Sequence, residues 1–443
     1  MQRLSNKTYS VIIQGCRTNQ YEGEAIAAAL EAQGAAHSET SPDITVIVSC
    51  TITAQADRKC RKLIRRIRRG NPSALIIACG CYAQKISEEE RTALGLDIVV
   101  GNRLKHLIPE LAAQHFEKGS EAAFSVIPQT EIIKEPSWDS LELDRPRLHT
   151  RAFLKVQDGC NHYCSYCIVP YVRGNPVSRG MESAVREAEK IISSGCPEIV
   201  LTGIHIGLYE NLPELVRRIG SIAGLKRLRF GSIEPFAVDE KLLDALAETE
   251  TFCRHLHMPL QSGDDGVLSV MRRGYTAAEF AKMAENARAR LGNGLHISTD
   301  LMVGFPTESA AAFQNSMSFI RDIGFGKVHV FPYSPREGTD AALMELPPDA
   351  EVQARVHEAL LTAEELHKKY CSSFIGKKIE ILAEENKDGI MCGLAQNYIR
   401  IAAASDGTQP PALTSVVPTE YREGTLLCAC APKEENSDFG NVI

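Results

Sequence analysis

Three cysteines lie close together near the middle of the 443-residue chain, at Cys160, Cys164 and Cys167. Three residues separate the first pair and two separate the second, so all three thiols can face one compact metal cluster. A structural zinc site closes its tetrahedron with a fourth ligand, and His162 inside the loop would have to supply it. An iron–sulfur cluster with one open iron takes three thiolates and no fourth residue. The spacing therefore favours an iron–sulfur site over a zinc knuckle.

Three further cysteines are scattered in the sequence but share one position relative to predicted strands. Cys16, Cys50 and Cys81 each follow a short apolar run, at 9–13, 44–49 and 75–78 respectively. Parallel strands bring their carboxyl ends to one edge of a sheet, where α/β proteins bind ligands. A single buried cysteine is usually a core residue, but the shared position predicts a second cluster with an open iron. We expect Cys79 and the remaining cysteines to be structural.

The composition agrees with a folded protein that keeps these thiols reduced. Hydrophobic residues make up 44% of the chain and charged residues 24%, as in globular proteins. The first residues contain no apolar signal region, and no apolar run reaches the length of a membrane span. With fourteen cysteines, this favours thiols in a reducing compartment, and we expect a cytoplasmic protein without a membrane partner. The net charge of −7 means that a nucleic-acid partner would need a local basic patch.

The pattern of apolar runs divides the chain into four segments. Residues 1–115 alternate strand and helix patterns and predict a parallel α/β sheet domain; residues 116–148 lose that rhythm and predict a linker with an irregular strand. Residues 149–370 contain six strand–helix units, which indicate a partial (β/α)6 barrel, and end in a connecting helix at 350–370. Residues 371–435 contain short strands and predict a small all-β barrel. The expected fold class is therefore a multidomain α/β protein.

The cysteine loop after a barrel strand resembles the radical S-adenosylmethionine (SAM) superfamily. In that superfamily the open iron binds the amino and carboxylate groups of the methionine moiety, and the reduced cluster cleaves SAM to a 5′-deoxyadenosyl radical. By this resemblance, SAM would be held by residues at the carboxyl ends of the barrel strands: Thr202, Gly203, Ser232, Glu234 and Gln261. Arg173 and Arg179, just beyond the cluster loop, are candidates to bind a carboxylate of cofactor or substrate.

The order of the segments resembles the tRNA methylthiotransferases over essentially the whole chain. In that family the terminal β-barrel is an RNA-binding module called the TRAM domain. Four stretches are similar to the branch that acts on N6-threonylcarbamoyladenosine: QGCRTNQYE at 14–22, CTITAQADRK at 50–59, HLHMPLQSG at 255–263 and FPYSPREGT at 331–339. The TRAM motif appears as GLAQNY at 393–398, with Leu394 where the family has tyrosine, and it makes Asn397 and Tyr398 candidates for RNA contact.

A strongly basic stretch follows Cys50 by eight residues. It contains eight cations in twelve positions and a narrow apolar seam, which predicts a helix with broad basic flanks. On an acidic protein, such a concentration indicates contact with RNA phosphates rather than only a solvated face. The predicted RNA-binding residues are Arg58, Lys59, Arg61, Lys62, Arg65, Arg66, Arg68 and Arg69.

The resemblance implies a transferase that installs a 2-methylthio group on N6-threonylcarbamoyladenosine at position 37 of tRNA. It implies two 4Fe-4S clusters, two molecules of SAM per turnover and a reducing electron donor of the flavodoxin or ferredoxin type. The first cluster would generate the radical, and the cluster at Cys16, Cys50 and Cys81 would deliver sulfur.

Alternatives remain at this stage. The target could be isopentenyladenosine in tRNA or an aspartate of a ribosomal protein. The chain could also be a radical enzyme with one competent cluster, or a non-catalytic RNA-binding protein whose cysteines hold zinc.

Overall fold

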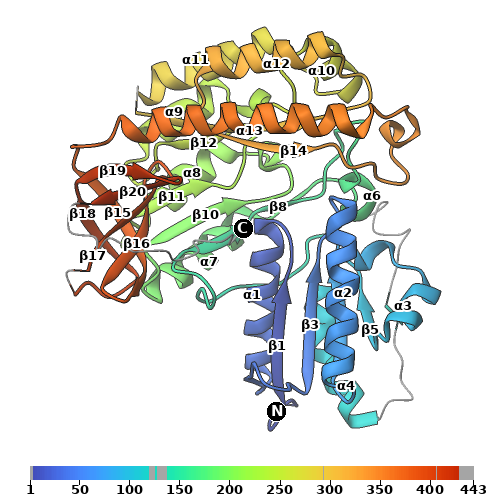
Figure 1. Cartoon of the computed structure of the whole chain (residues 1–443). Helices are drawn as coiled ribbons and strands as arrows, with labels where there is room; N and C mark the ends of the chain where they lie inside the picture. The colour runs from blue at the N-terminus through green and yellow to red at the C-terminus, as the bar shows by residue number, and fades with distance from the viewer. Residues whose placement is uncertain (1–2, 119–124, 127–136, 293, 406, 429–443) are drawn as a thin grey trace.

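The computed structural model of the chain describes residues 3–118, 125–126, 137–292, 294–405 and 407–428. Figure 1 shows three parts: an N-terminal α/β domain (blue), a central α/β domain (green to orange) and a C-terminal β-sheet (red). Within the described residues, no helix is long and apolar enough to cross a bilayer.

The N-terminal domain is built on a parallel sheet with helices on both faces. Strands β3 and β4 are buried at every position because β-branched and aliphatic side chains cover both of their faces. The sheet order is β2 (Ala36–His37), β1 (Thr8–Ile13), β3 (Ile44–Ser49), β4 (Leu75–Gly80), β5 (Ile98–Val100) and β6 (Ser125–Val126). The covering helices are α1 (Arg17–Ala32), α2 (Ala54–Gly70), α3 (Glu88–Leu94) and α4 (Ile108–Lys118). All strand carboxyl ends therefore meet at one edge, as the sequence predicts.

The central domain contains six parallel strands in two three-stranded sheets. Their orders are β11-β10-β7 and β12-β13-β14, and a parallel bridge between Leu228 and Phe252 connects the two. The strands are β7 (Ala152–Lys155), β10 (Glu198–Thr202), β11 (Arg227–Phe230), β12 (His255–His257), β13 (His296–Val303) and β14 (Lys327–Pro332). The intervening helices are α7 (Met181–Ser193), α8 (Leu212–Gly220), α9 (Glu240–Glu248), α10 (Asp265–Met271), α11 (Ala277–Leu291) and α12 (Ala310–Ile323), and α13 (Asp349–Ser372) leads to the C-terminal sheet.

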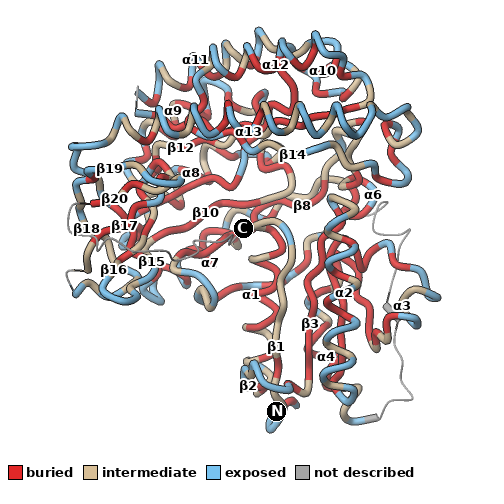
Figure 2. Tube along the Cα trace, viewed as in Figure 1, coloured by how far each residue is buried: buried red, intermediate tan, exposed pale blue. Residues whose placement is uncertain are grey.

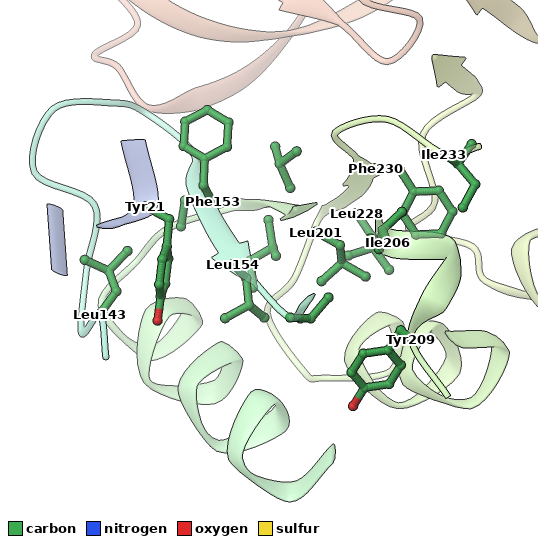
Figure 3. Packing of buried hydrophobic residues seen from close by; sticks show 14 of the residues in the cluster. Tyr21, Leu143, Phe153, Leu154, Leu201, Ile206, Tyr209, Leu228, Phe230 and Ile233 are labelled. Atoms are coloured by element: carbon green, nitrogen blue, oxygen red, sulfur yellow. The ribbon is translucent and has the colours of Figure 1, made fainter. Parts of the chain in front are cut away.

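One continuous hydrophobic core joins the first two domains, so their carboxyl edges are held in a fixed relation. Tyr21 of α1 packs beside Leu143 against Phe153 and Leu154 of β7, as Figure 3 shows. The hydroxyl of Tyr21 donates a hydrogen bond of 2.8 Å to the carbonyl of Leu141. Strands on both sides of this junction, such as β3 and β10, are buried (red in Figure 2).

The C-terminal part is a six-stranded mixed sheet in the order β18-β15-β16-β17-β20-β19, counted over the described residues. Its strands are β15 (Ile379–Lys387), β16 (Ile390–Ala395), β17 (Arg400–Ala404), β18 (Ala412–Val416), β19 (Pro418–Arg422) and β20 (Thr425–Cys428). All pairs are antiparallel except β17 with β20. The sheet is attached to the central domain by Arg227 and Arg229 of β11, which donate to the carbonyls of Leu394 (2.9 Å) and Ala395 (2.7 Å).

Candidate active site

The loop that carries Cys160, Cys164 and Cys167 is positioned by a tight turn at the end of β8 (Gln157–Asp158). Gly159 has φ of +74°, and a Cβ there would lie 2.2 Å from the carbonyl oxygen of Asn175, so only glycine fits. The Cys160 amide then donates a 3.0 Å hydrogen bond to the carbonyl of Gly174. The loop closes on itself through a 2.9 Å hydrogen bond from the amide of Cys167 to the carbonyl of Cys164.

The three thiols of this loop lie near one another and near polar donors. Burial, together with the neighbouring thiol of Cys164, raises the pKa of Cys160 to about 11 and that of Cys167 to about 12. The His162 amide donates to Cys160 Sγ at 3.4 Å, and Arg273 Nη1 donates to Cys164 Sγ at 3.4 Å. These donors stabilise negative charge on sulfur, which is what a cluster ligand carries.

Arg273 is a site residue that motif spacing did not indicate. Besides Cys164, its guanidinium binds the carboxylate of Glu234 at 2.8 Å, the carbonyl of Pro259 at 3.0 Å and the hydroxyl of Tyr275 at 3.0 Å. It therefore fixes Glu234 beside the cysteine loop. The nearest signal in the sequence is the pair Arg272–Arg273 after α10, and such a pair does not reveal which residues it contacts.

The residues proposed to hold SAM lie at the carboxyl ends of the strands that surround this loop. Thr202 ends β10, Ser232 and Glu234 follow β11, and Gln261 follows β12 with φ of +74°. Among the described residues, the buried Oε1 of Gln261 and the buried Nε2 of His205 have no hydrogen-bond partner. His205 Nδ1 lies 3.5 Å from Cys160 Sγ, and Gln261 follows a strand of the same domain. Buried polar atoms without partners here fit a polar cofactor, because such atoms are rarely left unsatisfied.

Gly203, one of the residues predicted to hold SAM, lies against the Gln157 side chain. A Cβ at Gly203 would lie 3.0 Å from the Cβ of Gln157. The Gln157 side chain donates to the carbonyls of Asp158 and Gly159, and its Oε1 accepts from the His205 amide at 2.7 Å. Gly203 thus makes room for Gln157, which supports the turn before the cysteine loop.

The second set of cysteines gathers at the carboxyl edge of the N-terminal sheet. Cys16 stands at the start of α1, Cys50 follows β3, and Cys81 follows β4. Gly15 has φ of +116°, and a Cβ there would lie 2.7 Å from the Cβ of Cys50, which shows how closely the first two loops approach. Burial raises the pKa of Cys50 to about 12, and the nearby thiols of Cys81 and Cys16 add to the shift.

The described residues contain no group of three or more His, Cys, Asp or Glu side chains arranged around a single ion position. The thiolates of an iron–sulfur cluster bind different irons, so its ligands need not converge as the ligands of one zinc ion do. Both cysteine sets have the donor chemistry for such a cluster.

Arg173 lies with the second cysteine set. It is fully buried, and its Nε donates to Cys81 Sγ at 3.1 Å. Its other N–H groups bind Asn19, Glu22 and Asp158. Arg173 therefore contacts a cysteine 92 residues away, and its contact with a SAM carboxylate stays a prediction. Arg179 pairs with the buried Glu187.

The carboxyl edges of the two domains face each other through contacts between the quoted sequence motifs. Arg336, after β14, donates to Thr51 Oγ1 at 2.9 Å and to Asp57 Oδ2 at 2.6 Å. Arg17, next to Cys16, donates to the carbonyl of Gly231 after β11. Residues next to Cys16 and Cys50 thus contact loops that follow strands of the central domain.

Comparison with known proteins decides the family. Residues 154–320 match the Radical SAM superfamily, and residues 8–101 match the Uncharacterized protein family UPF0004. The chain is 35% identical over 402 residues to the threonylcarbamoyladenosine tRNA methylthiotransferase MtaB of Bacillus subtilis (strain 168), covering 87% of this chain and 88% of that protein. The chain belongs to the tRNA methylthiotransferase family. It is a radical SAM protein, and membership of that superfamily implies a 4Fe-4S cluster and SAM.

Other relatives of this methylthiotransferase carry two different names. MtaB of Thermotoga maritima is 31% identical over 89% of this chain and 91% of its own length. The tRNA-2-methylthio-N(6)-dimethylallyladenosine synthase of Legionella pneumophila (strain Corby) is 34% identical over 83% and 85%. Among solved structures, the radical S-adenosylmethionine methyltransferase TsrM from Kitasatospora setae, with cobalamin and a [4Fe-4S] cluster bound, shares the fold: the TM-score is 0.58 and the identity 16%, over 76% of this chain and 77% of that one.

The basic stretch of the methylthiotransferase forms helix α2, at the front of the N-terminal domain in Figure 1. Two of its eight cations are used internally: Arg61 lies 3.5 Å from Glu90, and Arg68 binds the carbonyls of Gly95 and Ala74. The six exposed cations are Arg58, Lys59, Lys62, Arg65, Arg66 and Arg69. Four of these, at positions 58, 62, 65 and 69, recur at helical spacing and lie on one face.

The two residues of the TRAM-like motif turn inward in this methylthiotransferase. Asn397 is buried. Its backbone carbonyl contacts His296 Nδ1 at 2.5 Å, and its side-chain Nδ2 donates to the Tyr370 hydroxyl at 3.2 Å. The Tyr398 ring lies 4.5 Å from the Arg229 guanidinium, and its hydroxyl accepts from Arg17 at 3.4 Å. These residues therefore join the C-terminal sheet to the other domains, and their contact with RNA stays a prediction.

Proposed function

We propose that this methylthiotransferase converts N6-threonylcarbamoyladenosine at position 37 of tRNA into its 2-methylthio derivative, using two 4Fe-4S clusters. The observation that carries the proposal is that two sets of three cysteines lie on carboxyl edges that contact each other. Arg336 and Arg17 bridge these edges directly. A base held at this junction would be within reach of both sets, as a reaction that removes hydrogen and inserts sulfur at one carbon requires.

The cofactors would carry the difficult chemistry, and the protein would bind and orient them. When bound, the first cluster with SAM supplies a radical that takes hydrogen from C2 of adenine, and the second cluster with a second SAM supplies sulfur and methyl. Glu234, fixed by Arg273, would accept hydrogen bonds from SAM. Gln261 Oε1 and His205 Nε2 would gain the partners they lack. The continuous core packs behind both edges; Cys50 and Cys81 are buried, whereas Cys16 and the three cysteines of the first set are partly exposed.

Polar side chains on neighbouring barrel strands favour the threonylcarbamoyl group over an isopentenyl group. His257 Nε2 lies 3.3 Å from Asp300 Oδ2, and the rings of His257 and His329 are 5.6 Å apart. Asp300 and His329 are register partners on β13 and β14, and His329 is exposed. The threonylcarbamoyl group offers a carboxylate, a hydroxyl and N–H groups, whereas an isopentenyl group would offer this polar cluster no hydrogen bonds.

The tRNA itself would bind along α2. Its six exposed cations offer phosphate contacts on a protein with net charge −7, which otherwise repels RNA. The reaction also needs an electron from a flavodoxin- or ferredoxin-type donor, and tRNA as substrate fits a cytoplasmic enzyme.

The test combines cluster counting with product analysis. After anaerobic reconstitution we expect about eight irons per chain in the parent and about four in the Cys160→Ala/Cys164→Ala/Cys167→Ala variant. With reductant and SAM, nucleosides from N6-threonylcarbamoyladenosine-containing tRNA should include the 2-methylthio product, and tRNA carrying isopentenyladenosine should react much less. About four irons in the parent and none in the variant would refute the second cluster, and equal reaction of both tRNAs would refute the substrate assignment.

A further inference from the structure

We propose that Arg173 is a positioning residue for the second cluster: its guanidinium holds the Cys81 thiolate and ties the second cysteine set to the loop of the first. The inference rests on the proposed two-cluster function and extends it to a residue outside both cysteine sets.

Every N–H group of Arg173 has a partner. A guanidinium carries five N–H donors in a fixed plane. Nε donates to Cys81 Sγ at 3.1 Å; Nη1 donates to Glu22 at 2.9 Å and Asp158 at 3.1 Å; Nη2 donates to Asn19 at 2.7 Å and Glu22 at 3.2 Å. Asn19 Oδ1 is also 3.7 Å from the thiol of Cys16. Arg173 therefore contacts one cysteine of the set and the neighbour of another.

The charges around Arg173 are unbalanced without a thiolate. Glu22 and Asp158 are the two carboxylates of this buried cluster, and Lys105, Lys155 and Arg173 are the three cations that bind them. All five are buried. The adjacent buried Arg103 and Asp139 add one charge of each sign and leave the sum unchanged. An excess positive charge away from water is costly, and a cluster-bound thiolate at Cys81 brings the missing negative charge.

Arg173 also connects the two cysteine sets mechanically. It is the last residue of α6 (Val169–Arg173), a short helix that begins two residues after Cys167. Ile168 and Val172 of this segment pack against Cys81 in a small apolar cluster. The segment that carries a ligand of the first cluster thus contacts a ligand of the second through both packing and a hydrogen bond. The distance between the two clusters would be set here.

The test measures the second cluster alone. In the Cys160→Ala/Cys164→Ala/Cys167→Ala background, the iron content, the EPR spectrum and the midpoint potential of the remaining cluster are compared with and without Arg173→Gln and Arg173→Lys. Arg179→Lys is the matched control. Arg179 is also buried, and its guanidinium contacts Glu187, Ser183 and Tyr21 rather than a cysteine. A thermal melt checks that each variant is folded.

We expect Arg173→Gln to shift the midpoint potential to a more negative value, because a positive charge and a hydrogen bond to sulfur both stabilise the reduced cluster. Arg173→Lys keeps the charge, preserves the buried network and should give a smaller shift in the same direction. Loss of the iron from a variant that melts like its background also supports positioning. An unchanged potential and spectrum in Arg173→Lys and Arg173→Gln would overturn the proposal. If the triple cysteine variant with Arg173 intact binds no iron, the proposed two-cluster function is refuted. This result does not depend on Arg173 and so differs from a failure of the Arg173 proposal.

Discussion

The two cysteine sets of this protein are built in opposite ways. Cys160, Cys164 and Cys167 lie within eight residues on one loop, and a single turn at Gly159 positions all three. The other set, Cys16, Cys50 and Cys81, takes one cysteine from each of three segments. Its assembly depends on the whole N-terminal sheet.

This difference teaches where each site is vulnerable. The compact loop requires local geometry and a neighbouring donor such as Arg273. The dispersed set requires long-range contacts: the Cys81 amide binds the Ser49 carbonyl at 2.9 Å, and Arg173 reaches Cys81 from another domain. A local site survives small shifts between domains, whereas a dispersed site beside a domain junction is sensitive to them.

The largest expected effect separates the chemistry of the two sets. Cys50→Ala should abolish the methylthio product while the enzyme still cleaves SAM, because the first cysteine set is untouched. The measurement is mass spectrometry of tRNA nucleosides together with chromatography of 5′-deoxyadenosine. Cys164→Ala is the companion variant and should lose both signals. Unchanged product in Cys50→Ala would remove the second set from the reaction.

A second large effect concerns the affinity for tRNA, which we propose binds along helix α2 of the N-terminal domain. Replacing Arg58, Lys62, Arg65 and Arg69 of α2 together by glutamine should raise the tRNA dissociation constant about 30- to 100-fold and lower the salt slope of binding by about 3. These side chains span about 16 Å along one helix face. Filter binding at several salt concentrations provides the measurement.

The control for α2 replaces four exposed cations of the central domain, each of which already pairs with an acidic residue: Lys190, Arg217, Lys282 and Arg290. Equal loss of affinity in both quadruple variants would mean that net charge, rather than the α2 face, governs binding.

Sequence patterns predicted the buried parallel strands well, and the C-terminal strands less completely. The run at 44–49 predicts a strand with its observed bounds, because a continuous β-branched run between turn residues leaves little ambiguity. In the C-terminal segment the pattern predicts short strands without bounds; the observed strands include Ile390–Ala395, Ala412–Val416 and Pro418–Arg422. Their short runs mix polar and small residues, and long-range pairing rather than local pattern defines them.

The site could be predicted only as far as topology determines it. Cysteines after parallel strands had to lie at one edge, so their position followed from the strand pattern. The arginines that organise the site act on partners far away in sequence: Arg273 binds Cys164 across 109 residues and Arg336 binds Thr51 across 285. No spacing rule reports such contacts. The packing of Tyr398 on Arg229 is a long-range contact of the same kind.

A smaller effect is expected at the contact between the two edges. Arg336→Met leaves the buried Asp57 with Lys85 and Thr51 only, and should lower the free energy of unfolding by about 2 kcal/mol. Because Thr51 adjoins Cys50, product formation should fall more than SAM cleavage. Chemical denaturation and the ratio of the two products measure these effects.

The matched control for Arg336 is Arg272→Met. Arg272 pairs at 2.6 Å with Asp340, but both side chains are more than half exposed, and such a surface pair contributes about 0–1 kcal/mol. Similar destabilisation in the two variants would show that the contact at Thr51 and Asp57 has no special role.

The smallest predicted effect tests whether the barrel side reads the substrate's polar group. His329→Leu replaces an exposed imidazole beside His257 and Asp300 by an apolar side chain of similar size. Loss of one or two hydrogen bonds should raise KM for tRNA carrying N6-threonylcarbamoyladenosine about three- to tenfold, and kcat should change little. Reaction with isopentenyladenosine-containing tRNA should improve in the same variant. His329→Gln, which retains a hydrogen-bond donor, should recover part of the loss. If Leu and Gln have equal effects, the polar cluster does not recognise the modified base, and selectivity must lie elsewhere along the junction.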